Sequence, residues 1–268
     1  MILCNFCGKN KDCLFCTSDI ERLQDLLNMY KCDFLKQYVF KHACSNGFFE
    51  IAEHLVKEVD IEMNDNVCLI NASSKGYLDI IKMLIDNGTN ISSRNDLAFR
   101  SACAYGNLDI AKLLLEKGAK IHSKNDYAIR WASYYGHYEV VKFLVEMGAN
   151  VNAKNDLSLR LACTSGSLVM VKYLVEVGAK CCDDALFRAS QNGHLEIVKF
   201  LVENGCSIEI ASERDRAYIL LCQKNKLKKQ IRAQKKIYFW WIPICYDLNR
   251  ECGKRMAEKN LQKFLEME

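Results

Sequence analysis

The stretch Gly193-His-Leu-Glu-Ile-Val-Lys-Phe-Leu-Val-Glu-Asn-Gly205 decides the fold of this chain. Two glycines enclose an apolar helix pattern, in which hydrophobic side chains recur three and four residues apart. The opening glycine has equivalents at intervals close to thirty residues: Gly47, Gly76, Gly106, Gly136 and Gly166. The closing glycine recurs in step with it, at Gly88, Gly118, Gly148 and Gly178. Such a period predicts a stack of small helical units rather than one closed core.

The unit from residue 95 to residue 124 shows the expected plan of one repeat. Asn95 and Asp96 can cap a first helix over residues 97–105, because a short side-chain oxygen accepts hydrogen bonds from the free amides of the first turn. Gly106 ends that helix, since glycine tolerates the left-handed conformation found at helix ends. The residues expected to face the core are Phe99, Ala102 and Cys103.

A second helix is expected over residues 108–117 of the same unit, and Gly118 stops it. Its predicted apolar stripe holds Ile110, Leu113 and Leu114. The two following units have the same glycines and apolar positions at the same spacing. Each unit is therefore expected to be a pair of short helices.

These stretches resemble the ankyrin repeat. The stretch that ends at Gly205 and the stretch Gly148-Ala-Asn-Val-Asn-Ala-Lys154 match the second half and the turn of the family's unit. The resemblance covers roughly residues 36–211 and implies an all-α ankyrin-repeat solenoid of helix–turn–helix units. Six repeats are expected, at residues 36–65, 66–95, 96–125, 126–155, 156–182 and 183–211.

The repeats depart from the family pattern at the start of the first helix. The family's unit is about 33 residues long and usually opens with Thr-Pro-Leu-His. This chain has Leu97-Ala-Phe-Arg100, Tyr127-Ala-Ile-Arg130 and Leu157-Ser-Leu-Arg160 instead, and about three loop residues fewer. The hydrogen bonds of the family's Thr and His should be absent, and the connection between repeats should be shorter. This short form is similar to the ankyrin arrays of giant DNA viruses of amoebae (mimivirus-like).

Composition indicates a soluble intracellular protein, cytoplasmic in its host cell if it is viral. Half of the residues are hydrophobic, and the net charge is 37 − 33 = +4. From Ala211 onward there are 14 basic and 7 acidic residues, a net of 14 − 7 = +7, so the repeats themselves are near neutral. The chain has fifteen cysteines, and its first residues do not read as a signal peptide. Cys44, Cys103 and Cys163 share one repeat position as small buried hydrophobes, which favours a reducing compartment.

The two ends of the chain are expected to differ from the repeats. Residues 1–17 are rich in cysteine, and residues 18–35 are expected to form a capping helix. Two Cys-x-x-Cys pairs can give four thiolates to one structural zinc ion, although the spacing between the pairs is short, and a disordered tail is the alternative. The four cysteines are Cys4, Cys7, Cys13 and Cys16. No other cofactor is expected.

Residues 212–268 are expected to form a basic helical cap on the last repeat. Its lysines and arginines could meet nucleic acid or an anionic membrane, but a solvated helix face is the favoured interpretation, so nucleic acid is an unlikely partner. The longest apolar run, residues 237–246, is about half as long as a membrane span. Membrane insertion is therefore not expected.

No residue pattern nominates a catalytic site, and we expect a non-catalytic scaffold that binds a protein on its concave face. In the family, the two positions before the first glycine of each repeat face that surface. They nominate Lys75, Tyr105, Tyr134, Tyr135, Ser165 and Asn192 for partner binding. Tyr134 and Tyr135 are expected to be exposed, whereas Trp131 is expected to fill a gap between repeats.

The partner itself cannot be named from the sequence; it would be a host protein if the chain is viral, and the chain is expected to act as a monomer. One alternative is an adaptor that brings a bound target to host machinery such as a ubiquitin ligase. A second alternative is nucleic-acid binding through residues 212–268. The first of these rests on analogy, and the second rests on the basic charge of that segment.

Overall fold

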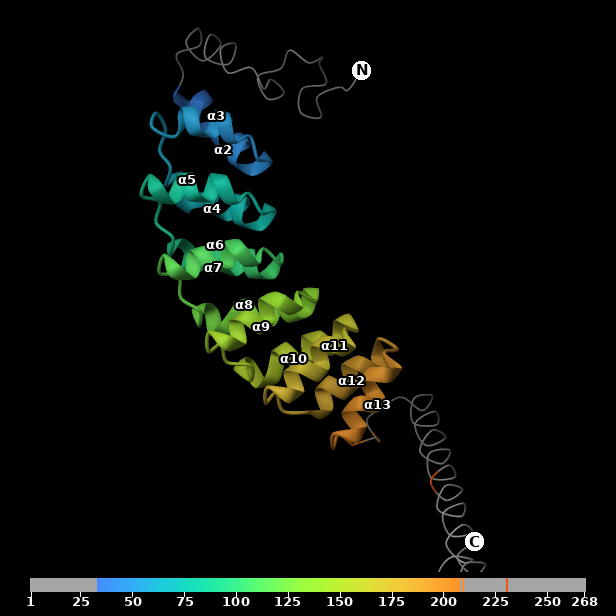
Figure 1. Ribbon diagram of the computed structural model, residues 1–268. Helices are drawn as coiled ribbons and strands as arrows, with labels where there is room; N and C mark the ends of the chain where they lie inside the picture. Colours follow the sequence, from blue (N-terminus) through green and yellow to red (C-terminus); the bar gives the residue numbers. More distant parts are fainter. Residues whose placement is uncertain (1–32, 208, 210–229, 231–268) are drawn as a thin grey trace, which may run out of the picture. The chain divides into compact units, whose positions relative to one another are not determined.

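The computed structural model describes residues 33–207, 209 and 230 (Figure 1). The chain divides into two compact units, residues 1–210 and 211–268, and nearly all described residues belong to the first unit. The four cysteines of the expected zinc site, residues 18–32 of the expected capping helix and the expected C-terminal cap lie outside the described residues. Within the described part the chain is all-helical and contains no strand, as the sequence predicts.

Twelve described helices form six consecutive pairs. We call the first helix of each pair the inner helix and the second the outer helix. The inner helices are α2 (Asp33–Asn46), α4 (Met63–Lys75), α6 (Ser93–Ala104), α8 (Ser123–Tyr135), α10 (Ala153–Ser165) and α12 (Asp183–Gln191). The outer helices are α3 (Phe49–Leu55), α5 (Leu78–Asp86), α7 (Leu108–Glu116), α9 (Tyr138–Glu146), α11 (Leu168–Glu176) and α13 (Leu195–Glu203).

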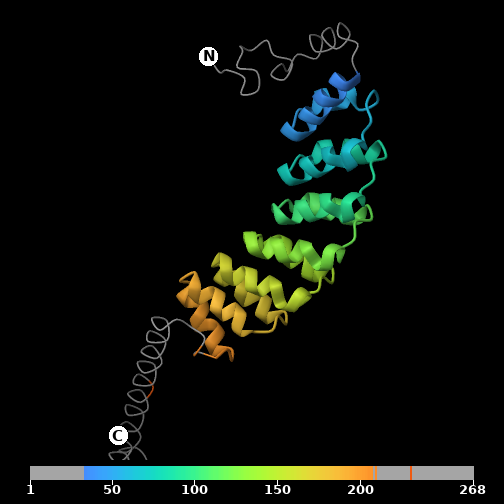
Figure 2. The same ribbon diagram turned by 180° about the vertical axis from the view of Figure 1, so that it is seen from behind.

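The pairs stack in chain order, as Figures 1 and 2 show. Successive inner helices, such as α6 and α8, pack closely, whereas successive outer helices, such as α7 and α9, make far fewer contacts. A stack of helix pairs curves toward the side on which its helices pack more closely. The inner helices therefore line the concave side of the stack.

The core of each repeat lies between the two helices of the pair and their neighbours in the stack. Phe99, Ala102 and Cys103 are fully buried, as predicted for the inner helix. On the outer helix the buried residues are Ile110, Ala111 and Leu114, whereas Leu113 is half-buried. Positions 110, 111 and 114 share one face because a helix turns about 100° per residue, and Leu113 lies at the edge of that face.

The expected cap at Asn95 and Asp96 is wrong. Arg94, Asn95 and Asp96 all have left-handed backbone conformations, with φ of 50°, 57° and 56°, whereas a helix N-cap is normally extended. The Asp96 carboxylate accepts hydrogen bonds from Lys120 and Ser123 of the next repeat instead. The same left-handed triplet recurs at residues 124–126 and 154–156. The triplet forms a kink in the short connection between repeats. Asparagine and aspartate tolerate the left-handed conformation better than most other side chains.

In α6 and α8, an arginine of the inner helix holds this triplet in place. Arg100 donates from Nε to the Asn95 carbonyl (2.9 Å) and from Nη2 to the Arg94 carbonyl (2.9 Å). Arg130 makes the equivalent bonds one repeat later. In the next repeat Arg160 pairs with Asp184 instead. The arginine that ends the Leu-Ala-Phe-Arg motif therefore fixes the start of the helix in place of the family's Thr and His.

The last residue of each triplet links its repeat to the next. Its side chain binds the backbone of the residue 24 positions later. Asp96, Asp126 and Asp156 accept hydrogen bonds from the amides of Lys120, Asn150 and Lys180, over 3.1, 2.9 and 3.1 Å. At the equivalent position of the second repeat, Asn66 donates from Nδ2 to the Asn90 carbonyl over 3.0 Å. We call these contacts inter-repeat clasps.

Candidate partner-binding surface

The centre of the inner-helix side carries a pair of exposed, stacked tyrosines. Tyr105 follows α6 and Tyr135 ends α8, so each stands directly before the glycine that closes its inner helix. Their side chains are 60% and 52% exposed. The ring centroids are 6.3 Å apart and the rings are nearly parallel, at 13°. A repeat period of thirty residues thus brings two equivalent aromatic side chains together across adjacent repeats.

The aromatic surface continues along α8. Tyr127, Trp131 and Tyr135 follow one another at four-residue spacing and so share one face of the helix. The Trp131 ring lies 5.6 Å from the ring of Tyr127 and 5.9 Å from the ring of Tyr135. Tyr134 packs edge-on against Tyr135 (5.0 Å, 74°) and against Trp131 (5.6 Å, 79°). We call Tyr105, Tyr127, Trp131, Tyr134 and Tyr135 the aromatic patch.

Two arginine side chains pack against the Tyr127 ring of the patch. The guanidinium carbons of Arg100 and Arg130 lie 4.8 Å and 5.5 Å from the centre of the Tyr127 ring. Both side chains are largely buried, and burial lowers the pKa of each. The same two guanidinium groups hold the left-handed triplets, so the patch rests on the hydrogen bonds that define the repeat.

The residues nominated from the sequence divide into two groups. Lys75, Tyr105, Tyr135, Ser165 and Asn192 are exposed, at the same turn of successive repeats. Tyr134 is half-buried rather than exposed, because its ring packs against its two aromatic neighbours. Only the aromatic members come together in one cluster; the other three lie in separate repeats.

Sequence reasoning missed the role of Trp131. It was expected to fill a gap between repeats, but its half-buried ring contacts three tyrosines of its own helix and belongs to the aromatic patch. Tyr127 was missed as well. The four-residue spacing of Tyr127, Trp131 and Tyr135 is visible in the sequence and could have indicated both.

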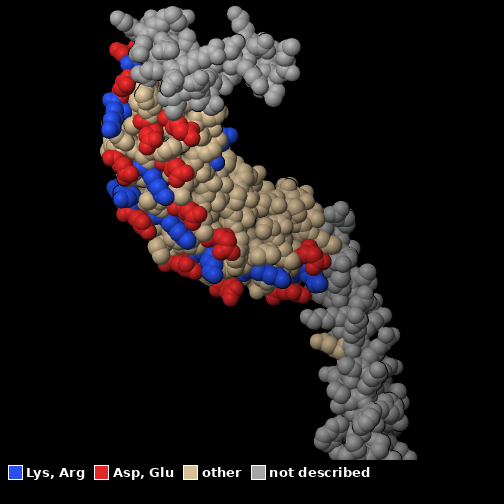
Figure 3. All heavy atoms as spheres, turned by 45° about the horizontal axis from the view of Figure 1, so that its top comes forward, with Lys and Arg blue, Asp and Glu red and all other residues tan. Residues whose placement is uncertain are grey.

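The inner-helix positions on either side of the patch are uncharged. At the positions that match Tyr127 and Trp131, the neighbouring inner helices carry Leu97 and Ser101 on one side and Leu157 and Leu161 on the other, all half-buried. Figure 3 shows that the charged side chains gather in a band of alternating sign, beside a broad area without lysine, arginine, aspartate or glutamate. An uncharged surface with large exposed rings is suited to contact with another protein surface.

The buried cysteines among the described residues are part of the hydrophobic core. Cys44, Cys103 and Cys163 are fully buried, as their repeat position predicts. Burial raises the pKa of the Cys103 and Cys163 thiols far above neutral pH, so both stay protonated and unreactive. In the described part of the chain, no group of three histidine, cysteine, aspartate or glutamate side chains could hold a metal ion. The candidate zinc ligands at residues 4–16 lie outside it.

Comparisons with known proteins agree with this architecture. The family model described as ankyrin repeats (3 copies) matches residues 13–95, 95–155 and 155–212. The human "Ankyrin repeat and KH domain-containing protein 1" is 40% identical over 50 residues, which are 18% of this chain and 2% of that protein. The chain thus spans a very small part of that relative. These matches give no support to a viral origin.

The crystal structure of the human ASB11 ankyrin repeat domain has a similar fold. The TM-score is 0.60 at 23% sequence identity, and the match covers 68% of this chain and 96% of that domain. At this level of identity the likeness concerns the fold alone. Among the helices of the described residues, none combines the length and the apolar character needed to cross a bilayer.

Proposed function

The chain belongs to the ankyrin-repeat family, and we propose that it is a protein-binding scaffold whose partner contacts the aromatic patch on the inner-helix side. Repeats of this kind generally serve as protein–protein interaction modules rather than as enzymes. The observation that carries the proposal is the stacked pair of Tyr105 and Tyr135, each more than half exposed and each at the same repeat position.

The physical argument concerns what these rings gain on binding. Tyrosine and tryptophan bury large areas with few rotatable bonds, and they are enriched among the residues that dominate interface energies. The rings of the patch already restrain one another, so little rotamer entropy is left to lose on contact. Lys75, Ser165 and Asn192, which are exposed at the same turn of other repeats, would form the polar rim of the interface.

The adaptor and nucleic-acid alternatives both depend on residues 212–268. These residues, apart from Gln230, lie outside the described part of the chain, so no observation in the repeats favours either alternative. The scaffold function rests on the repeats alone and is the function that we propose.

Site-specific photo-crosslinking on the full chain tests the proposal. A photoreactive phenylalanine analogue at position 135 should crosslink to a partner protein in cells. The same analogue at position 169, where Val169 is 66% exposed on the outer helix α11, is the matched control. A crosslinked band at 135 that is absent at 169 would support the proposal. Equal crosslinking at both positions, or none at 135, would contradict it.

A further inference from the structure

One position of the outer helices carries a lysine in every repeat but the first. These residues, which we call the lysine column, are Lys82, Lys112, Lys142, Lys172 and Lys199. The equivalent position in the first described outer helix, α3, holds Glu53. The charge at this point of the repeat is therefore reversed once, at the N-terminal end of the described stack.

Two members of the lysine column, Lys112 and Lys172, pack forward onto the next outer helix. Lys112 Nζ lies 6.0 Å from the centre of the Phe143 ring, and Lys172 Nζ lies 5.9 Å from the centre of the Phe200 ring. In each case the ammonium group covers an apolar side chain of the following repeat, which is a favourable cation–π geometry. In the first pair of outer helices, the residues at these two positions are Glu53 and Met83.

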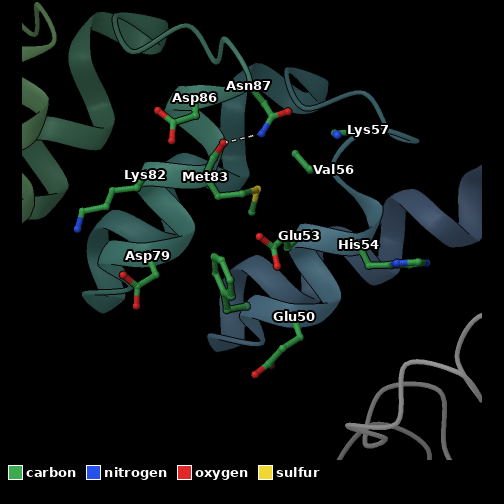
Figure 4. A pocket seen from close by; sticks show the side chains of 11 residues that line it. Glu50, Glu53, His54, Val56, Lys57, Asp79, Lys82, Met83, Asp86 and Asn87 are labelled. Atoms are coloured by element: carbon green, nitrogen blue, oxygen red, sulfur yellow. Dashed lines mark hydrogen bonds between the residues drawn. The ribbon is translucent and has the colours of Figure 1, made fainter.

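A groove of about 1000 Å³ lies between α3 and α5, at this altered pair (Figure 4). Phe49, Val56 and Met83 give the groove apolar walls, and Val56 and Met83 are buried. In Figure 4 the side chains of Glu53 and Met83 point into the space between the two helices, whereas Lys82 extends away from Glu53. At this pair of helices, the described part of the chain therefore has Glu53 at the position where the later repeats have a lysine.

The lining of the groove carries an excess of negative charge. Four carboxylates line it, namely Glu50, Glu53, Asp79 and Asp86, against the two ammonium groups of Lys57 and Lys82. Apolar walls under a carboxylate rim suit a long cationic side chain, whose methylene stem packs on the walls while its charged end meets the rim.

We propose that this groove receives a lysine or arginine side chain from a basic segment of a partner protein. The bound side chain would take the place that Lys112 and Lys172 take in the later repeats, over Met83 and beside Glu53. The proposal is independent of the aromatic patch, because the groove lies between outer helices and the patch lies on inner helices. The scaffold would then offer two contact surfaces of different chemistry.

A bare metal ion is a poorer occupant of the groove. Within the described chain, these carboxylates do not form a group that could hold one. They are distributed over two helices and several turns, which suits an extended cationic segment better than a compact ion.

The test is the affinity of the full chain for a fluorescein-labelled hexalysine peptide, measured by fluorescence anisotropy. The key variant is Glu53→Lys, which supplies the lysine that the other repeats already have and should fold normally. The matched control is Glu146→Lys, which makes the same charge change at an exposed position of α9. We expect Glu53→Lys to weaken binding at least tenfold and Glu146→Lys to leave it within about twofold. Equal losses in the two variants, or no binding by the unmodified chain, would overturn the proposal.

A second measurement locates the peptide independently of any substitution that changes charge. With methyl-labelled methionine, the Met83 methyl resonance can be assigned from its absence in Met83→Leu. Addition of hexalysine should shift this resonance, because the bound side chain lies on the Met83 wall. A Met83 signal that stays in place while the peptide binds would show that the peptide binds elsewhere, and would overturn the assignment to this groove.

Discussion

The imidazole ring of His137 lies against the turn of the preceding repeat, directly over Gly106. A methyl group placed on the Gly106 Cα would stand 2.5 Å from Nδ1 of His137, which is closer than any stable contact of this kind. The same arrangement recurs two repeats later, where His194 covers Gly166 and Nε2 of its ring lies 3.1 Å from the Thr164 carbonyl. The histidine that follows the glycine, at His137 and at His194, therefore packs against the repeat before its own.

Gly106→Ala should accordingly cost more stability than Gly136→Ala. Both glycines have left-handed backbones, with φ of 82° and 79°, so both variants carry a penalty of about 1 kcal/mol. Only at Gly106 must a neighbour also move, because nothing lies within 4 Å of the corresponding methyl position at Gly136. We expect a loss of about 2–3 kcal/mol for Gly106→Ala, measured by urea denaturation.

A double variant separates the two contributions. His137→Ala removes the obstructing ring, so the cost of Gly106→Ala measured in that background should fall close to the cost of Gly136→Ala. If the cost is unchanged in the His137→Ala background, the ring is not the cause of the penalty.

Arg100→Lys should destabilise the stack although it keeps the charge. The guanidinium group reaches the carbonyls of Arg94 and Asn95 at once, and the single ammonium group of lysine cannot reproduce that fork. Losing hydrogen bonds from a buried charged group costs about 1.5–3 kcal/mol. Chemical denaturation should show a loss in this range, whereas Lys117→Ala, at an exposed position directly after α7, should change stability by less than about 0.5 kcal/mol. Similar stabilities for the two variants would mean that the arginine does not hold the turn.

The sequence was sufficient for the helices and for most of the buried residues of the repeats. Periodic glycines and apolar spacing placed Phe99, Cys103 and Leu114 correctly, because both signals are local and recur in several copies. The left-handed turn at Arg94–Asp96 was misread as a helix cap. Asparagine and aspartate favour both structures, and the choice depends on the length of the connection and on the arginine that binds it.

The surfaces were harder to predict than the core. Tyr105 and Tyr135 could be nominated because the repeat period places them at equivalent turns. Their stacking, and the part that Trp131 takes in the patch, depend on how adjacent repeats pack. The groove at Glu53 lies where the first described pair lacks the lysine contact that is made in later repeats. No short sequence pattern predicts such a groove.

Replacing both Tyr105 and Tyr135 with alanine should separate binding from stability. The two side chains are more than half exposed, so the double variant should lose no more than about 1 kcal/mol of unfolding free energy. Partner binding should weaken by about 2 kcal/mol or more if the rings form the centre of the interface.

Leu144→Ala is the matched core variant for this comparison. Leu144 is fully buried, and the cavity left by its truncation should cost about 2–5 kcal/mol of stability. Thermal melting and partner capture should therefore rank the two variants in opposite orders. A tyrosine double variant that unfolds, or that keeps its full affinity, would exclude the patch as the binding surface.

We expect the inter-repeat clasp at Asp96 to contribute to the stability of the stack. Its carboxylate is 3% exposed and accepts hydrogen bonds from the Lys120 amide (3.1 Å) and from the Ser123 hydroxyl of the next repeat. Asp96→Ala leaves a backbone donor without its partner, at a cost of about 1–3 kcal/mol, and should speed hydrogen exchange of the Lys120 amide. Asp96→Asn should recover much of the loss, because an amide oxygen can still accept.

Asp109→Ala, on the exposed side of α7, is the control and should leave the exchange of Lys120 unchanged. If Asp96→Ala leaves both the stability and the exchange of Lys120 as they are in the unmodified chain, the repeats are joined by their apolar faces alone.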